Sequence, residues 1–164
     1  MLQRIERGIY AKGLTRELIP KKDICIAVHP FFLRKDIGPV EKTLIFEEKL
    51  KKELNKLNST LIVFEEEYEV NDNYNIITQF FNTTENSLII IPTYEANPTP
   101  NRTNWCGAIN FIKSIWNEKN SIKLLGGYIW KDKYSIYRGC LGYTEIKLNE
   151  FGIPTQLIKE LTFS

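Results

Sequence analysis

The sequence predicts a three-layer α/β/α domain, a Rossmann-like sandwich with a mainly parallel sheet of about five strands. Its 164 residues are the usual size of one domain, and its 43% hydrophobic content is sufficient for a core. Short apolar runs rich in β-branched residues alternate with stretches of helical periodicity. This alternation is typical of parallel strands joined by crossover helices, which cover both faces of an open sheet.

The first twenty residues give no sustained hydrophobic period. They contain Gly8 and Gly13 and end at Pro20. We therefore expect a loosely structured N-terminal segment over residues 1–20, with one short helical or strand piece at most. The single α/β domain is expected to cover residues 21–164.

The first strand and helix follow this segment. Asp23–Val28 is nearly all apolar, as expected of a strand buried on both faces, and His29-Pro30 ends it. Gly38-Pro39 opens a helix, because proline is favoured in a first helical turn. The apolar stripe of this helix is expected to be Val40, Leu44, Phe46, Leu50, Leu54 and Leu57.

The alternation repeats with a second strand at Thr60–Phe64. The acidic run Glu65–Glu69 behind it is interpreted as the point where the strand meets water, with a cation site as the alternative. Asn71-Asp72-Asn73 offers N-caps for a helix that carries Tyr74, Ile77, Phe80 and Phe81. The third strand is expected at Ser87–Ile91.

A loop rich in proline and asparagine, residues 93–102, follows the third strand. Long ordered loops in compact domains are often functional, so this loop is a candidate binding element. Thr103 or Asn104 caps the next helix, whose apolar stripe is Trp105, Ala108, Ile109, Ile112, Ile115 and Trp116. Ser121–Leu125 is the fourth strand, and Gly126-Gly127 ends it.

The last part of the chain predicts a hairpin or excursion over residues 128–137, then a helix and a strand. The helix begins at Gly139-Cys140 and ends at Gly152, which suits a left-handed terminator. The fifth strand is Gln156–Phe163.

Composition excludes several classes of protein. The net charge of +2, from 22 basic and 20 acidic residues, is too balanced for a nucleic-acid clamp, although the lysine-rich first helix keeps nucleic-acid binding as a weaker alternative. The apolar runs are too short to span a membrane, and the N-terminus lacks the apolar core of a signal peptide, so we expect a cytoplasmic protein. Three widely spaced cysteines favour reduced thiols over a disulfide framework or a metal site. We expect no cofactor.

Ligands of open parallel sheets bind at the carboxyl ends of the strands, where the winding direction reverses. Chain order gathers the candidate site residues at this edge. The candidate catalytic residues are Cys140, His29 and Glu95, and the candidate ligand-binding residues are Tyr94, Gly126, Gly127, Trp130 and Arg138.

Cys140 is the main chemical candidate. A thiol in the first turn of a helix faces unpaired N–H groups, which lower its pKa and favour the thiolate, and Arg138 adds positive charge. His29 is then a candidate base, and Glu95 either orients the histidine or acts as the base. The alternatives are a small buried hydrophobe at Cys140, a turn with a satisfied imidazole at His29, and a solvated carboxylate at Glu95.

The C-terminal stretch resembles the isochorismatase-like cysteine hydrolases over about 25 residues. Cys140 is followed by Thr144, then by Phe151-Gly152 and the closing apolar run 156–162. The resemblance implies a parallel sheet of five or six strands and a nucleophilic cysteine that opens the helix after the fourth strand. The family has an aspartate after the first strand, where this chain has His29. It has a lysine after the third strand, where this chain has Tyr94 and Glu95.

Two functions follow as hypotheses. The first is a divergent isochorismatase-like protein that binds a small polar or aromatic molecule and hydrolyses an amide or ester through Cys140. The alternative is a non-catalytic Rossmann-like module that binds a ligand or a protein partner. We also expect a homo-oligomer formed through the aromatic surface of the domain.

Overall fold

A mixed β-sheet forms the centre of the protein in a computed structural model, which describes residues 2–6, 9–12, 23–31, 40–54, 56, 59–66, 77, 88–93 and 105–163. The strands are β1 (Leu2–Glu6), β2 (Ile9–Lys12), β3 (Ile24–Val28), β4 (Thr60–Glu66), β5 (Leu88–Thr93), β6 (Ile122–Gly127), β7 (Trp130–Lys131), β8 (Tyr137–Arg138) and β9 (Thr155–Phe163). The helices are α2 (Val40–Leu54), α5 (Trp105–Ile115) and α6 (Gly139–Glu150).

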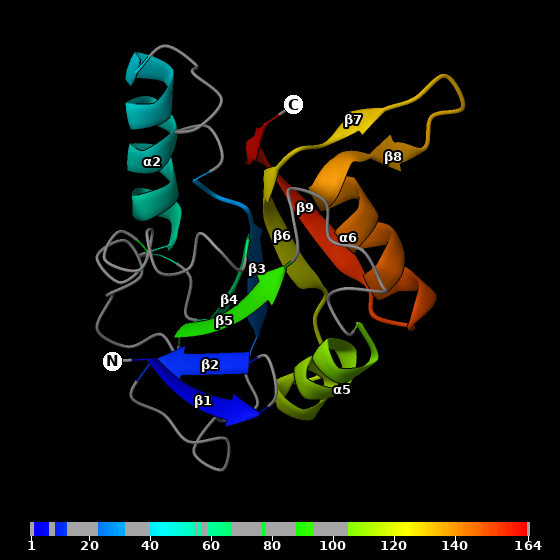
Figure 1. The fold of residues 1–164 in the computed structure, drawn as a ribbon. Coiled ribbons are helices and arrows are strands. Elements are labelled where there is room, and N and C mark those ends of the chain that lie inside the picture. The colour runs from blue at the N-terminus through cyan, green and yellow to red at the C-terminus, as the bar shows by residue number, and fades with distance from the viewer. Residues whose placement is uncertain are drawn as a thin grey trace.

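The main sheet has the strand order β1-β2-β5-β4-β3-β6-β9 in the described residues (Figure 1). Its central part, from β5 to β9, is parallel throughout. Along the chain the winding runs from β3 through β4 to β5 and then returns to β6 on the other side of β3. The winding direction therefore reverses between β3 and β6, as in a doubly wound Rossmann-like sheet, and the predicted fold class is confirmed.

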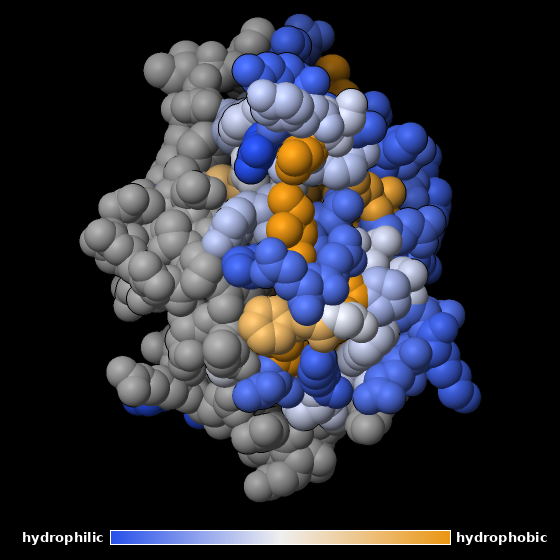
Figure 2. Space-filling model, turned by 90° about the vertical axis from the view of Figure 1, so that its right-hand side faces the viewer, coloured by the Kyte–Doolittle hydropathy of each residue, from blue (hydrophilic) through white to orange (hydrophobic). Residues whose placement is uncertain are grey.

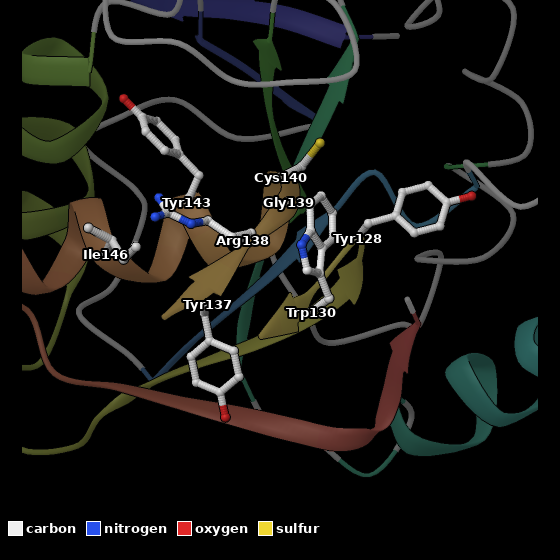
Figure 3. Close-up of a pocket in the computed structure, with 8 residues that line it drawn as sticks. All are labelled: Tyr128, Trp130, Tyr137, Arg138, Gly139, Cys140, Tyr143 and Ile146. Carbon is white, nitrogen blue, oxygen red and sulfur yellow. The ribbon is translucent and has the colours of Figure 1, made fainter. Parts of the chain in front are cut away.

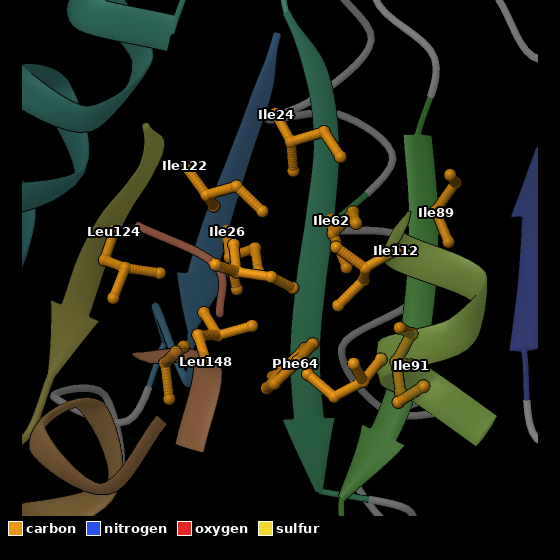
Figure 4. Packing of buried hydrophobic residues seen from close by; sticks show 14 of the residues in the cluster. Ile24, Ile26, Ile62, Phe64, Ile89, Ile91, Ile112, Ile122, Leu124 and Leu148 are labelled. Atoms are coloured by element: carbon orange, nitrogen blue, oxygen red, sulfur yellow. The ribbon is translucent and has the colours of Figure 1, made fainter. Parts of the chain in front are cut away.

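The helices cover both faces of the sheet. On one face, α5 and α6 bury an apolar cluster that includes Ile26, Phe64, Ile112 and Leu148 (Figure 4). On the other face, α2 buries a second cluster that includes Leu50. Two apolar faces on one sheet require a layer on each side, and this requirement produces the three-layer arrangement.

The N-terminal segment extends the sheet, which differs from the expected loose structure. β1 pairs with β2 in antiparallel fashion, and β2 pairs with β5, the outermost strand of the parallel part, through Tyr10–Ile90 and Ala11–Ile89. The partner of this hairpin lies some eighty residues away in the sequence. The hairpin is therefore stabilised by pairing with a strand that is distant in sequence, and local hydrophobic periodicity cannot predict such pairing.

The buried stripe of α2 differs from the expected one. Phe46, Leu50 and Leu54 are buried as predicted, but Leu44 is 55% exposed. Thr43 and Glu47 occupy buried positions beside this stripe instead. The reason is geometric, because Leu44 lies about 100° around the helix from Thr43 and so faces away from the sheet.

The C-terminal elements agree with the sequence prediction. β7 and β8 form the expected hairpin, α6 begins at Gly139, and Gly152 has the left-handed φ of +78°. The expected second helix lies outside the described residues except for Ile77, which is helical and buried. The expected loop also lies outside them except for Thr93, the last residue of β5.

Candidate functional site

The candidate site lies at the carboxyl ends of β3 and β6, where the winding reverses. Val28 of β3 pairs in register with Gly126 of β6. A Cβ atom on Gly126 would collide with the carbonyl oxygen of Val28, and one on Gly127 would collide with the ring of Phe163. These two glycines therefore permit close packing of the strands.

The hairpin β7–β8 rises from this edge and is organised by one carboxylate. Oδ1 of Asp132 accepts hydrogen bonds from the backbone N–H groups of Tyr134 (2.8 Å) and Ile136 (3.0 Å). Oδ2 accepts a hydrogen bond from Nε of Arg138 (2.9 Å). The bond from Ile136, followed by those from Tyr134 and Arg138, lowers the pKa of Asp132, so this carboxylate stays charged at neutral pH.

A pocket of about 450 Å³ lies between the hairpin and the start of α6 (Figure 3). It is lined by Tyr128, Trp130, Tyr137, Arg138, Gly139, Cys140, Tyr143 and Ile146. Gly139 has a φ of +86°, and a Cβ atom there would collide with the indole of Trp130. Gly139 thus lets the indole approach the start of the helix, and the lining becomes strongly aromatic.

Cys140 is the second residue of α6 and is only 7% exposed. Burial raises the pKa of its thiol to about 11; hydrogen bonds from the N–H groups of Tyr128 and of Cys140 itself lower it, and the charge of Glu66 raises it. The expectation of a lowered pKa is therefore wrong, because burial outweighs the donors at the start of the helix. The thiol is protonated at neutral pH.

His29 lies at the same edge of the sheet, directly after β3, and is not among the residues that line the pocket. It has a φ of +43°, and its N–H donates to the carbonyl oxygen of Phe64 (2.8 Å). Its ring is buried, with Nε2 2.7 Å from Oγ1 of Thr93. Cys140, Trp130 and Arg138 thus share one pocket, whereas His29 interacts with the neighbouring end of β5.

Buried polar side chains concentrate at the ends of β3, β4 and β5, and the sequence analysis missed most of them. Glu65, Glu66 and Thr93 are buried beside His29, so the interpretation of Glu65 and Glu66 as the wet end of a strand is wrong. Glu66 pairs in register with Thr93. Burying carboxylates is costly, and clusters of this kind are typical of functional sites. The available signal was the position of Glu65 and Glu66 at the carboxyl end of the apolar strand β4, the end of a parallel sheet where ligands bind.

The remaining site candidates lie outside the described residues. Tyr94 and Glu95 belong to this group, as do residues 67–69 of the acidic run. Within the described ranges, no group of three His, Cys, Asp or Glu side chains could hold a metal ion. None of the described helices has the length and apolar character needed to cross a membrane. The cytoplasmic location stays a prediction.

The comparisons with known proteins assign no family, so the protein is classified by its fold alone, as a doubly wound α/β protein with an aromatic pocket. No protein-family model matches the chain, and no curated protein or solved structure matches it significantly.

Proposed function

We propose that the protein binds a small molecule with a flat, partly aromatic framework in the pocket between the hairpin and α6. The pocket itself carries this proposal. Its volume of about 450 Å³ is in the range of small-molecule sites, which are mostly apolar with a few polar groups. It also lies beyond the carboxyl end of β6, one of the two strands between which the winding reverses, and ligands of open α/β sheets usually bind near such ends.

Hydrolysis of an amide or ester through Cys140 is the second candidate function. Two observations support this candidate. The thiol lines the pocket, and it accepts hydrogen bonds from the backbone N–H groups of Tyr128 and Cys140. These hydrogen bonds favour the thiolate form of Cys140, which is the nucleophile that the reaction needs. The resemblance of residues 140–162 to the isochorismatase-like hydrolases supports the same reaction, whereas His29 at the position of the family's aspartate is a departure from the family pattern. The raised pKa of Cys140 favours binding over catalysis.

Thermal unfolding with a panel of aromatic carboxylates, carboxamides and nucleosides tests the binding proposal. A ligand at 100 times its Kd adds about 2.7 kcal/mol to stability. Trp130→Ala should abolish the shift, because Trp130 lines the pocket. Tyr134→Ala is the matched control, since Tyr134 is an aromatic residue of the same hairpin that is 69% exposed. An equal shift in both variants, or no shift with any member of the panel, would contradict the proposal.

Mass spectrometry after incubation with activated aromatic esters tests the hydrolase candidate. The expected result is an acyl adduct on Cys140 that is absent from Cys140→Ser and that disappears as the product accumulates. Ester turnover that is unchanged in Cys140→Ser would exclude this thiol as the nucleophile.

We further propose self-association through the exposed apolar side chains of the hairpin. Tyr134 and Ile136 are exposed there. Residues coloured as hydrophobic also form a broken strip on this side of the molecule (Figure 2). Sedimentation equilibrium should detect a dimer that Tyr134→Ser and Ile136→Ser together weaken. A monomer at all concentrations would contradict this proposal.

A further inference from the structure

We infer that the ligand of this pocket carries a carboxylate or a similar planar anion, which binds the guanidinium group of Arg138. This inference rests on the proposed small-molecule site and names the chemical class of its ligand.

The first argument is the charge of the lining. Among the eight described lining residues, Arg138 is the one that is charged at neutral pH, and the others are aromatic, aliphatic, glycine or a protonated thiol. A charge beside apolar walls interacts more strongly with an opposite charge than it does in open water. Asp132 balances part of this charge through its ion pair with Nε of Arg138, and the terminal nitrogens of the guanidinium are the donors that an anionic group in the pocket would meet.

Two lysines add positive charge around the same walls. Nζ of Lys131 lies 5.0 Å from the ring centroid of Tyr137, and Nζ of Lys147 lies 5.8 Å from that of Tyr143. Lys147 also pairs with Glu150, so its charge is partly compensated. The cations are held against the aromatic rings of the pocket, an arrangement that favours an approaching anion.

The second argument is the orientation of the guanidinium. Asp132 accepts a hydrogen bond from Nε alone, so its contact does not use the two terminal nitrogens of Arg138. These nitrogens present parallel N–H donors that match the two oxygens of a carboxylate. Asp132 also holds the turn of the hairpin, so it acts as a positioning residue. It fixes the guanidinium fork, the two terminal nitrogens of Arg138, in place before the ligand binds.

The third argument is the shape of the site. Trp130 is 51% exposed and lies against Gly139, next to Arg138 in the chain (Figure 3). Tyr143 lies about one helical turn beyond Gly139, on the same stripe of α6. A flat ring can therefore contact aromatic side chains while its acid group reaches the arginine, which points to an aromatic carboxylate.

A titration followed by NMR tests the inference, with benzoate and its neutral isostere benzamide as probes and the indole N–H signal of Trp130 as reporter. Benzoate should bind roughly tenfold to a hundredfold more tightly than benzamide, the range for hydrogen bonds to a charged group. Arg138→Gln should remove this preference, and Arg138→Lys should keep part of it, because it keeps the charge without the fork. Lys133→Gln, which removes a cation elsewhere on the hairpin, should bind like the unaltered protein.

The outcomes separate this inference from the proposed function. Equal affinity for benzoate and benzamide, or a preference for benzoate that survives in Arg138→Gln, would overturn the inference that the ligand is an anion bound by Arg138. Binding of neutral members of the panel without benzoate would do the same. In both cases the proposed small-molecule site would still stand. If no member of the panel binds, both the site and its ligand class are wrong.

Discussion

Nε2 of His29 lies 2.7 Å from Oγ1 of Thr93, and this hydrogen bond joins the residue after β3 to the last residue of β5. β4 lies between those two strands, so the imidazole spans its end. The positive φ of His29 and the bond from its N–H to Phe64 turn the ring toward β5. The carboxyl ends of three strands are therefore tied together by a buried polar contact, next to the edge that carries the pocket.

Thr93→Val should lower the free energy of unfolding by about 1–3 kcal/mol, because it removes a buried partner of the imidazole while it keeps the shape of the side chain. Urea denaturation measures the change. Thr162→Val is the control, since the Thr162 hydroxyl bonds a backbone carbonyl at an exposed position. Equal losses in the two variants would show that the His29–Thr93 bond adds no stability beyond that of a surface contact.

The register of α2 leads to a second prediction. Leu50→Ala should destabilise the protein by about 2–5 kcal/mol, because Leu50 is fully buried against the sheet and its loss leaves a cavity. Leu44→Ala, on the exposed face of the same helix, should change stability by less than about 0.5 kcal/mol. Thermal or urea unfolding of the two variants measures the difference. A larger loss of stability in Leu44→Ala than in Leu50→Ala would contradict the assignment of the Leu50 face of α2 to the sheet.

Local patterns were sufficient to predict the central fold. The apolar runs that became β3, β4, β5 and β6 are each buried on both faces in their central residues, and such strands are recognisable from their own residues. The last strand, β9, is only partly buried, and its apolar residues Leu157, Ile158 and Leu161 were sufficient to predict it. The hairpin β1–β2 was not predicted, because it is stabilised by the edge of β5 far along the chain. Leu44 was assigned to the buried stripe because it is apolar, whereas the face of α2 that packs on the sheet carries the polar residues Thr43 and Glu47 beside Phe46 and Leu50.

The candidate site was predicted in part. Chain order and the rule for strand ends brought Cys140, Trp130 and Arg138 together, since all three follow β6 closely. Glu66 was assigned to solvent, because whether a polar residue at a strand end is buried depends on segments distant in sequence. The pKa of Cys140 could not be predicted either, since the helix start and burial act in opposite directions and only the structure gives the extent of burial.

The pKa of Cys140 predicts a steep pH dependence of its alkylation. Burial raises this pKa from 9.0 to about 11, so the thiolate fraction at pH 8 should be roughly 100-fold smaller than that of a free thiol. Iodoacetamide labelling of Cys140, followed by peptide mass spectrometry, should therefore be slow at pH 8 and should keep rising up to about pH 11. A rate that levels off near pH 8 would contradict the burial and would favour a catalytic thiolate.

The same shift has a consequence for stability. The folded-state pKa lies above the unfolded value, so the stabilising effect of the neutral thiol is fully present below about pH 9 and is lost as the pH rises toward 11. Cys140→Ala should flatten this alkaline loss of stability in urea titrations. Cys25, whose pKa burial raises to about 12, should supply the part of the loss that remains.

Two glycines with similar backbone angles test the packing of Trp130 on Gly139 in the pocket. Gly139 and Gly152 have φ values of +86° and +78°, so an alanine at either position pays for a left-handed conformation, about 1–2 kcal/mol. They differ in surroundings, because a Cβ atom on Gly139 would strike the Tyr128 carbonyl and the Trp130 indole, whereas Gly152 has nothing within 4 Å.

Gly139→Ala should therefore cost more stability than Gly152→Ala, and it should also disturb the pocket. The indole N–H signal of Trp130 should move in the NMR spectrum of Gly139→Ala and stay in place in Gly152→Ala, because the added methyl group displaces the indole from the start of α6. Urea denaturation of both variants supplies the stabilities. Equal stability losses with an unmoved Trp130 signal would mean that the indole does not pack on Gly139. The described shape of the pocket would then be wrong.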